Sequence, residues 1–295
     1  ELSSIVRVTP MEFFTRGQQV RCIAQLYHAS SHKDIVLTRR KADPIFFNGG
    51  YVADPRAGFW ELVICFDFNS LYPSIMIAYN ICFTTLLRKN GTIEDHKVNM
   101  FSIDQEEPAD FKPTSNDNFD YGDYYELTEE EKELKGKKVK KHYDFGFVNK
   151  DVRKGLLPEI LENLLGNRKK AKKEMKKAAK MIEVIDDNIL IPYRENSDIK
   201  VEELNDKGRE LMKQFFDLDS GFIKEHDEAI NKEFFSYKVR ETMFNSRQLG
   251  LKVSANSIYG FLGAQVSGKF SLIEASMCVT SRGRELIIQF FYFNV

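Results

Sequence analysis

One short stretch of the sequence holds the residue types needed to bind a metal ion and a phosphate side by side. Residues 61–74 read ELVICFDFNSLYPS, in which Asp67 follows an apolar run and Asn69, Ser70 and Pro73 form a turn after it. Carboxylate oxygens are ligands that Mg²⁺ prefers, and backbone N–H groups in a turn bind anions. An aspartate that only caps the next helix gives the same local pattern. This stretch alone leaves both interpretations open.

The neighbouring sequence predicts the elements that position Asp67. Residues 62–66 are all apolar and rich in strand formers, which predicts a strand buried on both faces. Residues 75–87 continue with a helical apolar pattern. Upstream, Gly49 and Gly50 permit positive φ and a close backbone approach to a ligand, although such a pair is most often only a turn.

A predicted helix in residues 153–181 carries cations beyond its apolar stripe. Leu157, Ile160, Leu161, Leu164 and Leu165 form that stripe. Arg168 and Lys172 follow Leu164 at i+4 and i+8. The first half of the helix is therefore expected in a core, and its basic half is aimed at another partner or at solvent.

A second predicted helix, in residues 241–264, carries one continuous polar face. That face consists of Gln248, Lys252, Asn256 and Tyr259, and Gly260 is predicted to end the helix. Leu249, Val253 and Ile258 are predicted to pack on the other side. A face with one lysine among amides and a tyrosine differs from an ordinary solvated face, which carries many charges. With Asp67 and the first helix, it supplies the metal ligand and the cations that phosphoryl transfer requires.

Composition excludes several classes of protein. The 295 residues suffice for two domains or one large one, and the net charge of −1 says little about partners. Four widely spaced cysteines without a CxxC pair indicate reduced intracellular thiols, so neither a zinc site nor a disulfide framework is expected. No apolar run is long enough for a membrane span, and no signal peptide is present. The first residue is Glu1, not methionine, and the last ones interrupt an apolar pattern, so we expect a piece of a longer protein.

Several motifs together resemble those of family B DNA polymerases. DFNSLYPS (67–74) and KVSANSIYG (252–260) are similar to two signature motifs of that family, in the family's order. RKGLLPEILENLLGNRKKAK (153–172) resembles its fingers helix, most closely that of the delta-type replicative subunits. FNGGYV (47–52) resembles the linker between exonuclease and polymerase domains, and TPMEFFTRGQQV (9–20) the end of the exonuclease domain.

The resemblance implies roles for individual residues. Asp67 would be a catalytic carboxylate that binds both Mg²⁺ ions, and the Phe68 carbonyl would bind the second ion. Tyr72 would lie under the sugar of the nucleotide and exclude a 2′-hydroxyl. The other implied contacts are with the triphosphate for Ser70, Leu71, Arg168, Lys172, Lys252 and Asn256, and with the template or the new base pair for Gly49, Gly50, Tyr259 and Gly260.

Two departures from the family pattern stand out. Phe47 occupies a position where the family usually has tyrosine. The third family motif, Tyr-Gly-Asp-Thr-Asp, supplies the second catalytic carboxylate and does not follow residues 252–260. Tyr121-Gly122-Asp123 cannot replace it, because it lies between the first two motifs and Tyr125 stands where the second acid belongs. We therefore expect this segment alone to be inactive.

The resemblance implies an α+β fold: an antiparallel palm sheet that carries Asp67, and a helical fingers hairpin. The expected parts are the end of the exonuclease domain and linker (1–50), the first part of the palm with the metal-binding motif (51–87), a polar insertion in the palm (88–151), fingers helices with an insertion at about 176–240 (152–260), and a truncated return to the palm (261–295).

The implied activity is that of a DNA-directed DNA polymerase, a nucleotidyltransferase that extends a primer 3′ end in DNA replication by two-metal phosphoryl transfer. Its expected partners are primer–template DNA, deoxynucleoside triphosphates, and a sliding clamp or accessory subunits, with no membrane. The insertions, with the delta-like motifs, indicate a protist or a large DNA virus, and hence the nucleus or a viral replication site. The alternatives are a non-catalytic DNA-binding polymerase homologue and an RNA-making or RNA-copying polymerase; Tyr72 argues against the latter.

Overall fold

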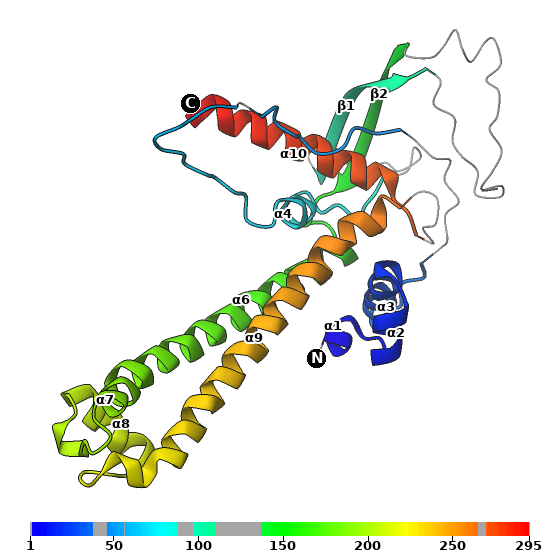
Figure 1. Cartoon of the computed structure of the whole chain (residues 1–295). Coiled ribbons are helices and arrows are strands. Elements are labelled where there is room, and N and C mark those ends of the chain that lie inside the picture. The colour runs from blue at the N-terminus through cyan, green and yellow to red at the C-terminus, as the bar shows by residue number, and fades with distance from the viewer. Residues whose placement is uncertain are drawn as a thin grey trace, which may run out of the picture. The chain divides into compact units, whose positions relative to one another are not determined.

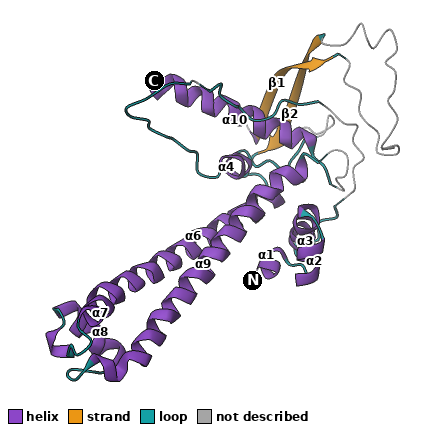
Figure 2. Ribbon diagram, in the orientation of Figure 1, coloured by secondary structure: helices purple, strands orange, loops and turns teal. Residues whose placement is uncertain are grey.

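The chain folds into two compact units of helices with one pair of strands. The computed structural model describes residues 2–37, 46–55, 57–87, 97–109, 137–264 and 270–294, and the tyrosine-glycine-aspartate sequence at 121–123 lies outside them. One unit is Leu165–Lys252, and the other combines Leu2–Leu164 with Val253–Val295. Figure 1 labels the elements, and Figure 2 shows that helices predominate over strands.

Helices form most of the larger unit. They are α1 (Leu2–Val6), α2 (Pro10–Thr15), α3 (Gln18–Ser31), α4 (Leu71–Ala78), α10 (Ile273–Asn294), the start of α6 (Leu156–Ile185) and the end of α9 (Asp227–Leu262). A capping box begins α2: the Thr9 side chain accepts from the Glu12 N–H, and the Glu12 carboxylate accepts from the Thr9 N–H. Gly17 precedes α3, which buries Cys22 and Leu26.

The sheet is one antiparallel hairpin, β1 (Val98–Pro108) and β2 (Lys138–Val148). Phe101, Ile103 and Phe147 are buried, and the Phe101 and Phe147 rings meet edge to face with centroids 5.8 Å apart. We had expected a polar surface segment here, and for these residues that expectation is wrong. Buried and exposed positions alternate along β1. The charged residues on its exposed side give the segment a polar composition, although its other side is buried.

The smaller unit folds around a core of its own. After α6 come a π-helix (Asp186–Leu190), α7 (Ile191–Glu195), a 3₁₀ turn (Val201–Glu203), α8 (Asp206–Phe216), a second 3₁₀ turn (Ile223–His226) and the first part of α9. Its fully buried side chains include Ile189, Met212 and Ile223. Asn205 caps α8 by accepting the Gly208 N–H at 2.7 Å.

The predicted strand at residues 62–66 is wrong. The backbone there is extended but unpaired, and Leu62 and Ile64 are 79% and 68% exposed. A strand needs a neighbouring strand for its backbone hydrogen bonds. In the part of the chain that the structure describes, β1 pairs with β2, and β2 also bridges Leu86 at Phe147, but neither strand pairs with residues 62–66. Asp67 is therefore not carried by a sheet here. The segment packs on α10 instead, where Phe66 and Phe290 meet with centroids 5.1 Å apart.

A buried asparagine joins three elements of the larger unit. The Asn80 side chain donates to the carbonyls of Val148 (2.7 Å) and Arg153 (2.8 Å) and accepts from the Gly155 N–H (2.8 Å). Asn80 is fully buried and has a left-handed φ of 55°. It therefore connects the end of α4, the end of β2 and the start of α6 through one side chain.

Candidate functional site

Three stretches that are far apart in the sequence meet at Tyr72. The rings of Tyr72 and Tyr259 are tilted by 41° with centroids 4.5 Å apart. A Cβ atom on Gly50 would lie 2.5 Å from the Tyr72 hydroxyl oxygen, so a side chain at this position would force Tyr72 to move. On another side, a Cβ atom on the buried Gly283 would lie 3.3 Å from Tyr72 Cε1. The structure thus brings together Gly50, Tyr72 and Tyr259, which the sequence assigned to one site.

An arginine that the sequence prediction missed binds residues 46–50, which we call the glycine segment. Arg284 Nη1, from α10, donates to the carbonyls of Asn48 (2.8 Å) and Gly49 (2.6 Å). These bonds use two backbone acceptors of an otherwise exposed turn. The available signal was an arginine after Gly283 within a largely apolar helix, but sequence spacing does not show what it contacts.

We call Gly50, Tyr72, Tyr259 and Arg284 the tyrosine cluster, and burial shifts the pKa values of two of its members, Tyr259 and Arg284. Burial, and then the neighbouring Tyr72, raise the pKa of Tyr259 to about 12, while Arg284 opposes the rise. Burial also lowers the pKa of Arg284, although Tyr72, Glu285 and Tyr259 counteract it. Tyr259 is therefore a neutral phenol at physiological pH, offering an aromatic face and a hydroxyl.

Asp67 and its neighbours lie immediately before α4. Asp67 is exposed, and Phe68 lies against Phe290 with ring centroids 5.8 Å apart. Ser70, the residue before α4, has left-handed φ and ψ of 54° and 52°, a conformation that is strained for a residue other than glycine. Leu71 begins the helix, and the Ser70 carbonyl accepts from the Ser74 N–H at 2.9 Å. The turn thus changes the chain direction abruptly between the acid and the helix.

Two of the residues present have oxygen atoms of the kind that Mg²⁺ prefers. Asp67 offers a carboxylate and Phe68 a backbone carbonyl, both of them oxygen ligands. Over the described ranges, no group of three or more His, Cys, Asp or Glu side chains could hold a metal ion. Mg²⁺ is commonly held by one or two carboxylates together with substrate phosphates and water. The chain therefore fits one side of such a site and needs further ligands.

The predicted triphosphate residues lie on two long helices. Arg168 (half-buried) and Lys172 (exposed) are one turn apart on α6, and Lys252 and Asn256 (both exposed) are one turn apart on α9. Gly260 does not end α9, which continues to Leu262.

The predicted faces of α9 need a correction. Leu249 and Val253 are each 49% exposed, whereas Gln248 from the predicted polar face is buried. Ile258 is buried as predicted, and the buried side of the helix also contains Leu251, Ser254, Ala255 and Leu262. Small and neutral residues at 254 and 255 pack closely, and a pattern search for large apolar residues overlooks them.

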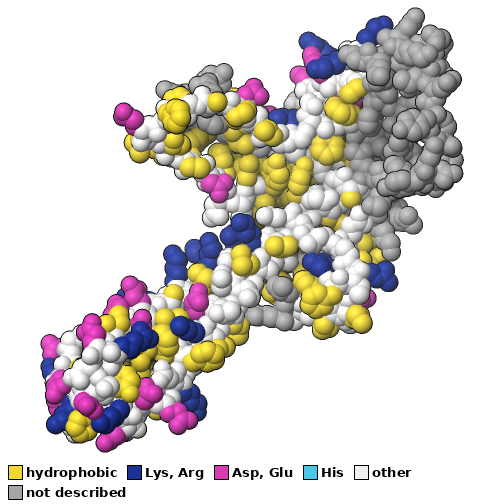
Figure 3. All heavy atoms as spheres, in the orientation of Figure 1, with side chains coloured by type: hydrophobic (Ala, Val, Ile, Leu, Met, Phe, Trp, Pro, Cys, Tyr) yellow, Lys and Arg dark blue, Asp and Glu magenta, His cyan; other side chains and the backbone are white. Residues whose placement is uncertain are grey.

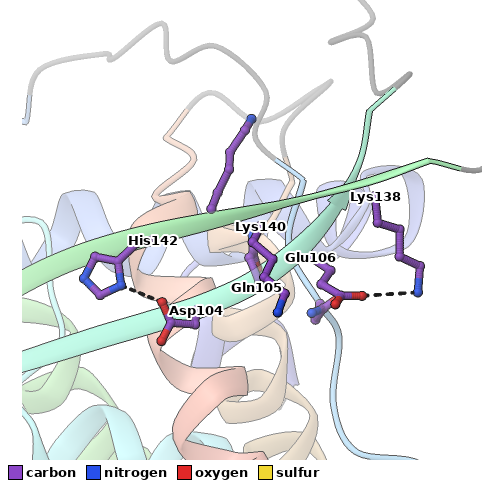
Figure 4. A pocket seen from close by; sticks show the side chains of 8 residues that line it. Asp104, Gln105, Glu106, Lys138, Lys140 and His142 are labelled. Carbon is purple, nitrogen blue, oxygen red and sulfur yellow. Dashed lines mark hydrogen bonds and ion pairs between the residues drawn. The ribbon is translucent and has the colours of Figure 1, made fainter. Parts of the chain in front are cut away.

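A groove of about 700 Å³ lies on the hairpin next to Asn48. Figure 4 shows its charged side chains, from β1 and β2. Most of them neutralise one another: Lys138 lies 3.5 Å from Glu106, and His142 lies 2.6 Å from Asp104. Asp104, by its hydrogen bond, and Asp144, by its charge, raise the pKa of His142. Because most of its charges are paired, the groove has little capacity left for a charged ligand.

A buried carboxylate anchors this groove to the glycine segment. Glu107 accepts hydrogen bonds from Tyr143 (2.6 Å) and Gln105 (2.8 Å) and pairs with Lys141 (2.6 Å). Gln105 also donates to the Phe46 carbonyl at 2.7 Å. Burial would raise the pKa of Glu107, but the bonds from Lys141, Tyr143 and Gln105 outweigh it and hold this pKa below its ordinary value.

None of the helices that the structure describes combines the length and apolar character needed to cross a bilayer.

Comparison with known proteins gives one consistent result. The model of DNA polymerase family B matches residues 8–188 and 229–291, leaving 189–228 outside the match. The chain is 31% identical over 291 residues to the DNA polymerase delta catalytic subunit of Candida albicans, covering 97% of this chain and 19% of that protein. The same subunit of Bos taurus is 30% identical over 294 residues, with 97% and 18% covered. The chain thus spans about a fifth of the length of these curated relatives.

Solved structures agree on the fold. The family B DNA polymerase of the hyperthermophilic archaeon Pyrobaculum calidifontis superimposes with a TM-score of 0.52 at 17% identity, covering 99% of this chain and 26% of that one. The α+β class predicted from the sequence is confirmed by this likeness together with the helix-rich structure and its antiparallel hairpin. Since the family match extends over most of the chain and meets the motifs at 67–74 and 252–260, the chain belongs to DNA polymerase family B.

Proposed function

We propose that the full-length protein is a DNA-directed DNA polymerase that adds deoxynucleotides to a primer 3′ end during replication. Family membership and the relatives named as delta catalytic subunits support this activity. The observation that carries it is the tyrosine cluster, in which Gly50, Tyr72 and Tyr259 meet although they come from three separate motifs. Such a cluster gives one surface with a rigid aromatic wall and close backbone approach, as a base pair requires.

Asp67 is proposed as a catalytic metal ligand, with the Phe68 carbonyl as a second ligand. Mg²⁺ bound there would stabilise negative charge on the reacting phosphoryl group. The left-handed Ser70 supports the assignment of Ser70 and Leu71 to the phosphates, because strained backbone before a helix turns N–H groups toward an anion. Further ligands, including the second carboxylate, are proposed to come from outside this segment.

Tyr72 is proposed to select the sugar. Its ring is confined by Tyr259, by the backbone of Gly283 and by Gly50, so it cannot easily swing away from a 2′-hydroxyl. Tyr72→Ala should therefore raise the ratio of ribonucleotide to deoxynucleotide kcat/KM, and Tyr72→Phe should leave it nearly unchanged. If Tyr72→Ala lowers kcat/KM for ribonucleotides and deoxynucleotides to the same extent, Tyr72 is only a packing residue.

The remaining site residues are proposed to grip the nucleotide and the template. Lys172, Lys252 and Asn256 are exposed and thus accessible to a triphosphate, and Arg168 is half-buried one turn before Lys172 on α6. Gly49 and Gly260 are exposed and are proposed to face the template or the new base pair. The two-metal mechanism asks for these cations because the transferred phosphoryl group carries its charge on peripheral oxygens.

The domain assignment is proposed as the sequence suggested it. Fingers at 152–260 enclose the compact unit Leu165–Lys252, and the family match omits 189–228, which supports an insertion within 176–240. The end of the exonuclease domain and the linker (1–50), the palm (51–87 and 261–295) and the segment 88–151, which contains the hairpin and lies within the family match, complete the order. Primer–template DNA, deoxynucleoside triphosphates and a sliding clamp or accessory subunits are the proposed partners, in the nucleus or at a viral replication site.

Primer extension by the full-length protein tests this function. Asp67→Asn removes one charge from the metal site, and each tenfold loss of rate corresponds to about 1.36 kcal/mol of barrier. We expect nucleotide addition to be abolished while primer–template binding persists. Asp54→Asn, at another exposed acid upstream of Asp67, is the matched control and should retain activity. Asp67→Asn activity within about tenfold of wild type would contradict the proposal.

A further inference from the structure

The Leu165–Lys252 unit separates its charges along its length. Residues 166–182 contain eight basic residues and one acidic residue, whereas residues 183–228 contain fourteen acidic and six basic residues. Figure 3 shows a group of dark-blue side chains along one edge of this helical unit, and magenta side chains mixed with dark-blue ones at its end. A surface that serves only solubility intersperses the two signs. The separation therefore needs another explanation.

Four lysines of α6 form a continuous line. Lys169, Lys173, Lys176 and Lys180 are spaced at i, i+4, i+7 and i+11, and all four are exposed. At about 100° per residue they fall within an arc of about 60°, and at 1.5 Å per residue they extend over about 16 Å. They lie on the side of α6 opposite the buried Ala171 and Ala178. We call these four lysines the α6 basic stripe.

The stripe is not neutralised from within. Considering the described residues only, none of its four ammonium groups has an ion-pair or hydrogen-bond partner, whereas the adjacent Lys177 pairs with Glu174 at 2.8 Å. Lysines three and four residues apart on a helix repel one another. The stripe also lies in the middle of α6, too far from its C-terminal end for the helix dipole to favour these charges. An external anion would remove this repulsion.

We propose that the α6 basic stripe binds the phosphodiester backbone of a nucleic-acid strand. A single triphosphate is too short to reach all four lysines over about 16 Å, whereas a strand presents one phosphate for about every 3.4 Å of helix axis. The stripe contains no aromatic residue on which bases stack, so it contacts the backbone without reading sequence. The acidic residues at 183–228 repel the same strand and confine the contact to the basic part of α6. The inference rests on the proposed function, since primer–template DNA is the strand available to this protein.

Equilibrium binding of the full-length protein to labelled primer–template DNA, over a series of salt concentrations, tests the proposal. One variant replaces Lys169, Lys173, Lys176 and Lys180 by Gln. The control replaces four other exposed lysines of the same unit by Gln, Lys170, Lys177, Lys232 and Lys238, so that the net charge changes equally. Each lost phosphate contact lowers the slope of log K against log salt by about 0.9 on duplex DNA and about 0.7 on a single strand.

We expect the slope of the stripe variant to be smaller by about 1.4 or more, which corresponds to the loss of two or more phosphate contacts. The slope of the control should be smaller by less than about 0.5. Equal losses in the two variants, or none in either, would overturn the proposal. Blunt duplex and duplex with a 5′ template overhang identify the strand: a loss only with the overhang assigns it to single-stranded template, and a loss with both assigns it to the duplex. Asp67→Asn should leave the slope unchanged, so failure of the stripe and failure of the catalytic proposal are separable.

Discussion

Replacing Asn80 by alanine should open the start of α6. The side chain makes three buried hydrogen bonds, to the carbonyls of Val148 and Arg153 and from the N–H of Gly155. Alanine would leave one donor and two acceptors unpaired, each at about 1–3 kcal/mol before relaxation. A left-handed φ of 55° adds about 1 kcal/mol for alanine. Allowing for relaxation, we expect the free energy of local opening to fall by about 3 kcal/mol, which raises the equilibrium constant for opening about 150-fold.

Hydrogen–deuterium exchange of the full-length protein measures this locally. The Gly155 amide should exchange about 150-fold faster in Asn80→Ala, because its acceptor is gone and opening is easier. Asn80→Gly loses the same hydrogen bonds, but glycine adopts the left-handed φ without strain. The increase in the Gly155 exchange rate should therefore be about fivefold smaller in Asn80→Gly than in Asn80→Ala. Asn163→Ala, at an exposed position of α6, is the control, and peptides from α3 should not change in any variant. Exchange at Gly155 within about threefold of wild type would refute the reasoning.

Two further predictions concern the glycine segment and its support. Gly50→Ala puts a Cβ atom 2.5 Å from the Tyr72 oxygen, so it should destabilise by about 1–3 kcal/mol. Adding Tyr72→Phe to Gly50→Ala should remove most of this loss of stability, because the next nearest Tyr72 atom, Cζ, would lie 3.8 Å from the new Cβ atom. If chemical denaturation shows that the effects of the two substitutions simply add, the predicted contact is wrong. Because the pKa of Glu107 is lowered in the folded state, its full contribution to the free energy of unfolding is present above its ordinary pKa of 4.5. That contribution is lost as the pH falls through the folded pKa. The difference in melting temperature between wild type and Glu107→Gln should therefore shrink below pH 4.5, and a constant difference would count against it.

Helices with a long apolar stripe were predictable from the sequence. The helix expected over 153–181 occupies Leu156–Ile185, and Arg168 and Lys172 lie on it as the spacing requires. Local periodicity suffices there, because each helix makes its hydrogen bonds within itself. The strand expected at 62–66 failed for the opposite reason: its pairing depends on a neighbouring strand, which the apolar run does not specify.

The tyrosine cluster was predictable only in part. Family motifs named Gly50, Tyr72 and Tyr259, but spacing alone does not show that the Tyr72 hydroxyl lies against Gly50. Arg284 was missed because its partners are two backbone carbonyls more than 200 residues earlier, which have no side-chain signature. Asn80 was missed for the same reason, since its three partners are also backbone groups.

The hairpin β1–β2 offers a practical position for modifying the protein. Its ladder runs from Val98↔Val148 to Pro108↔Lys138, and one more bond joins the Ala109 N–H to the Lys137 carbonyl at 2.9 Å. The two ends of residues 110–136 are therefore already held together, and each doubling of a loop's length adds only about 0.6 kcal/mol of closure free energy. A fluorescent protein or affinity tag inserted within 110–136 should leave the strand register and the buried Phe101 intact, which provides a label for single-molecule work without altering either chain terminus.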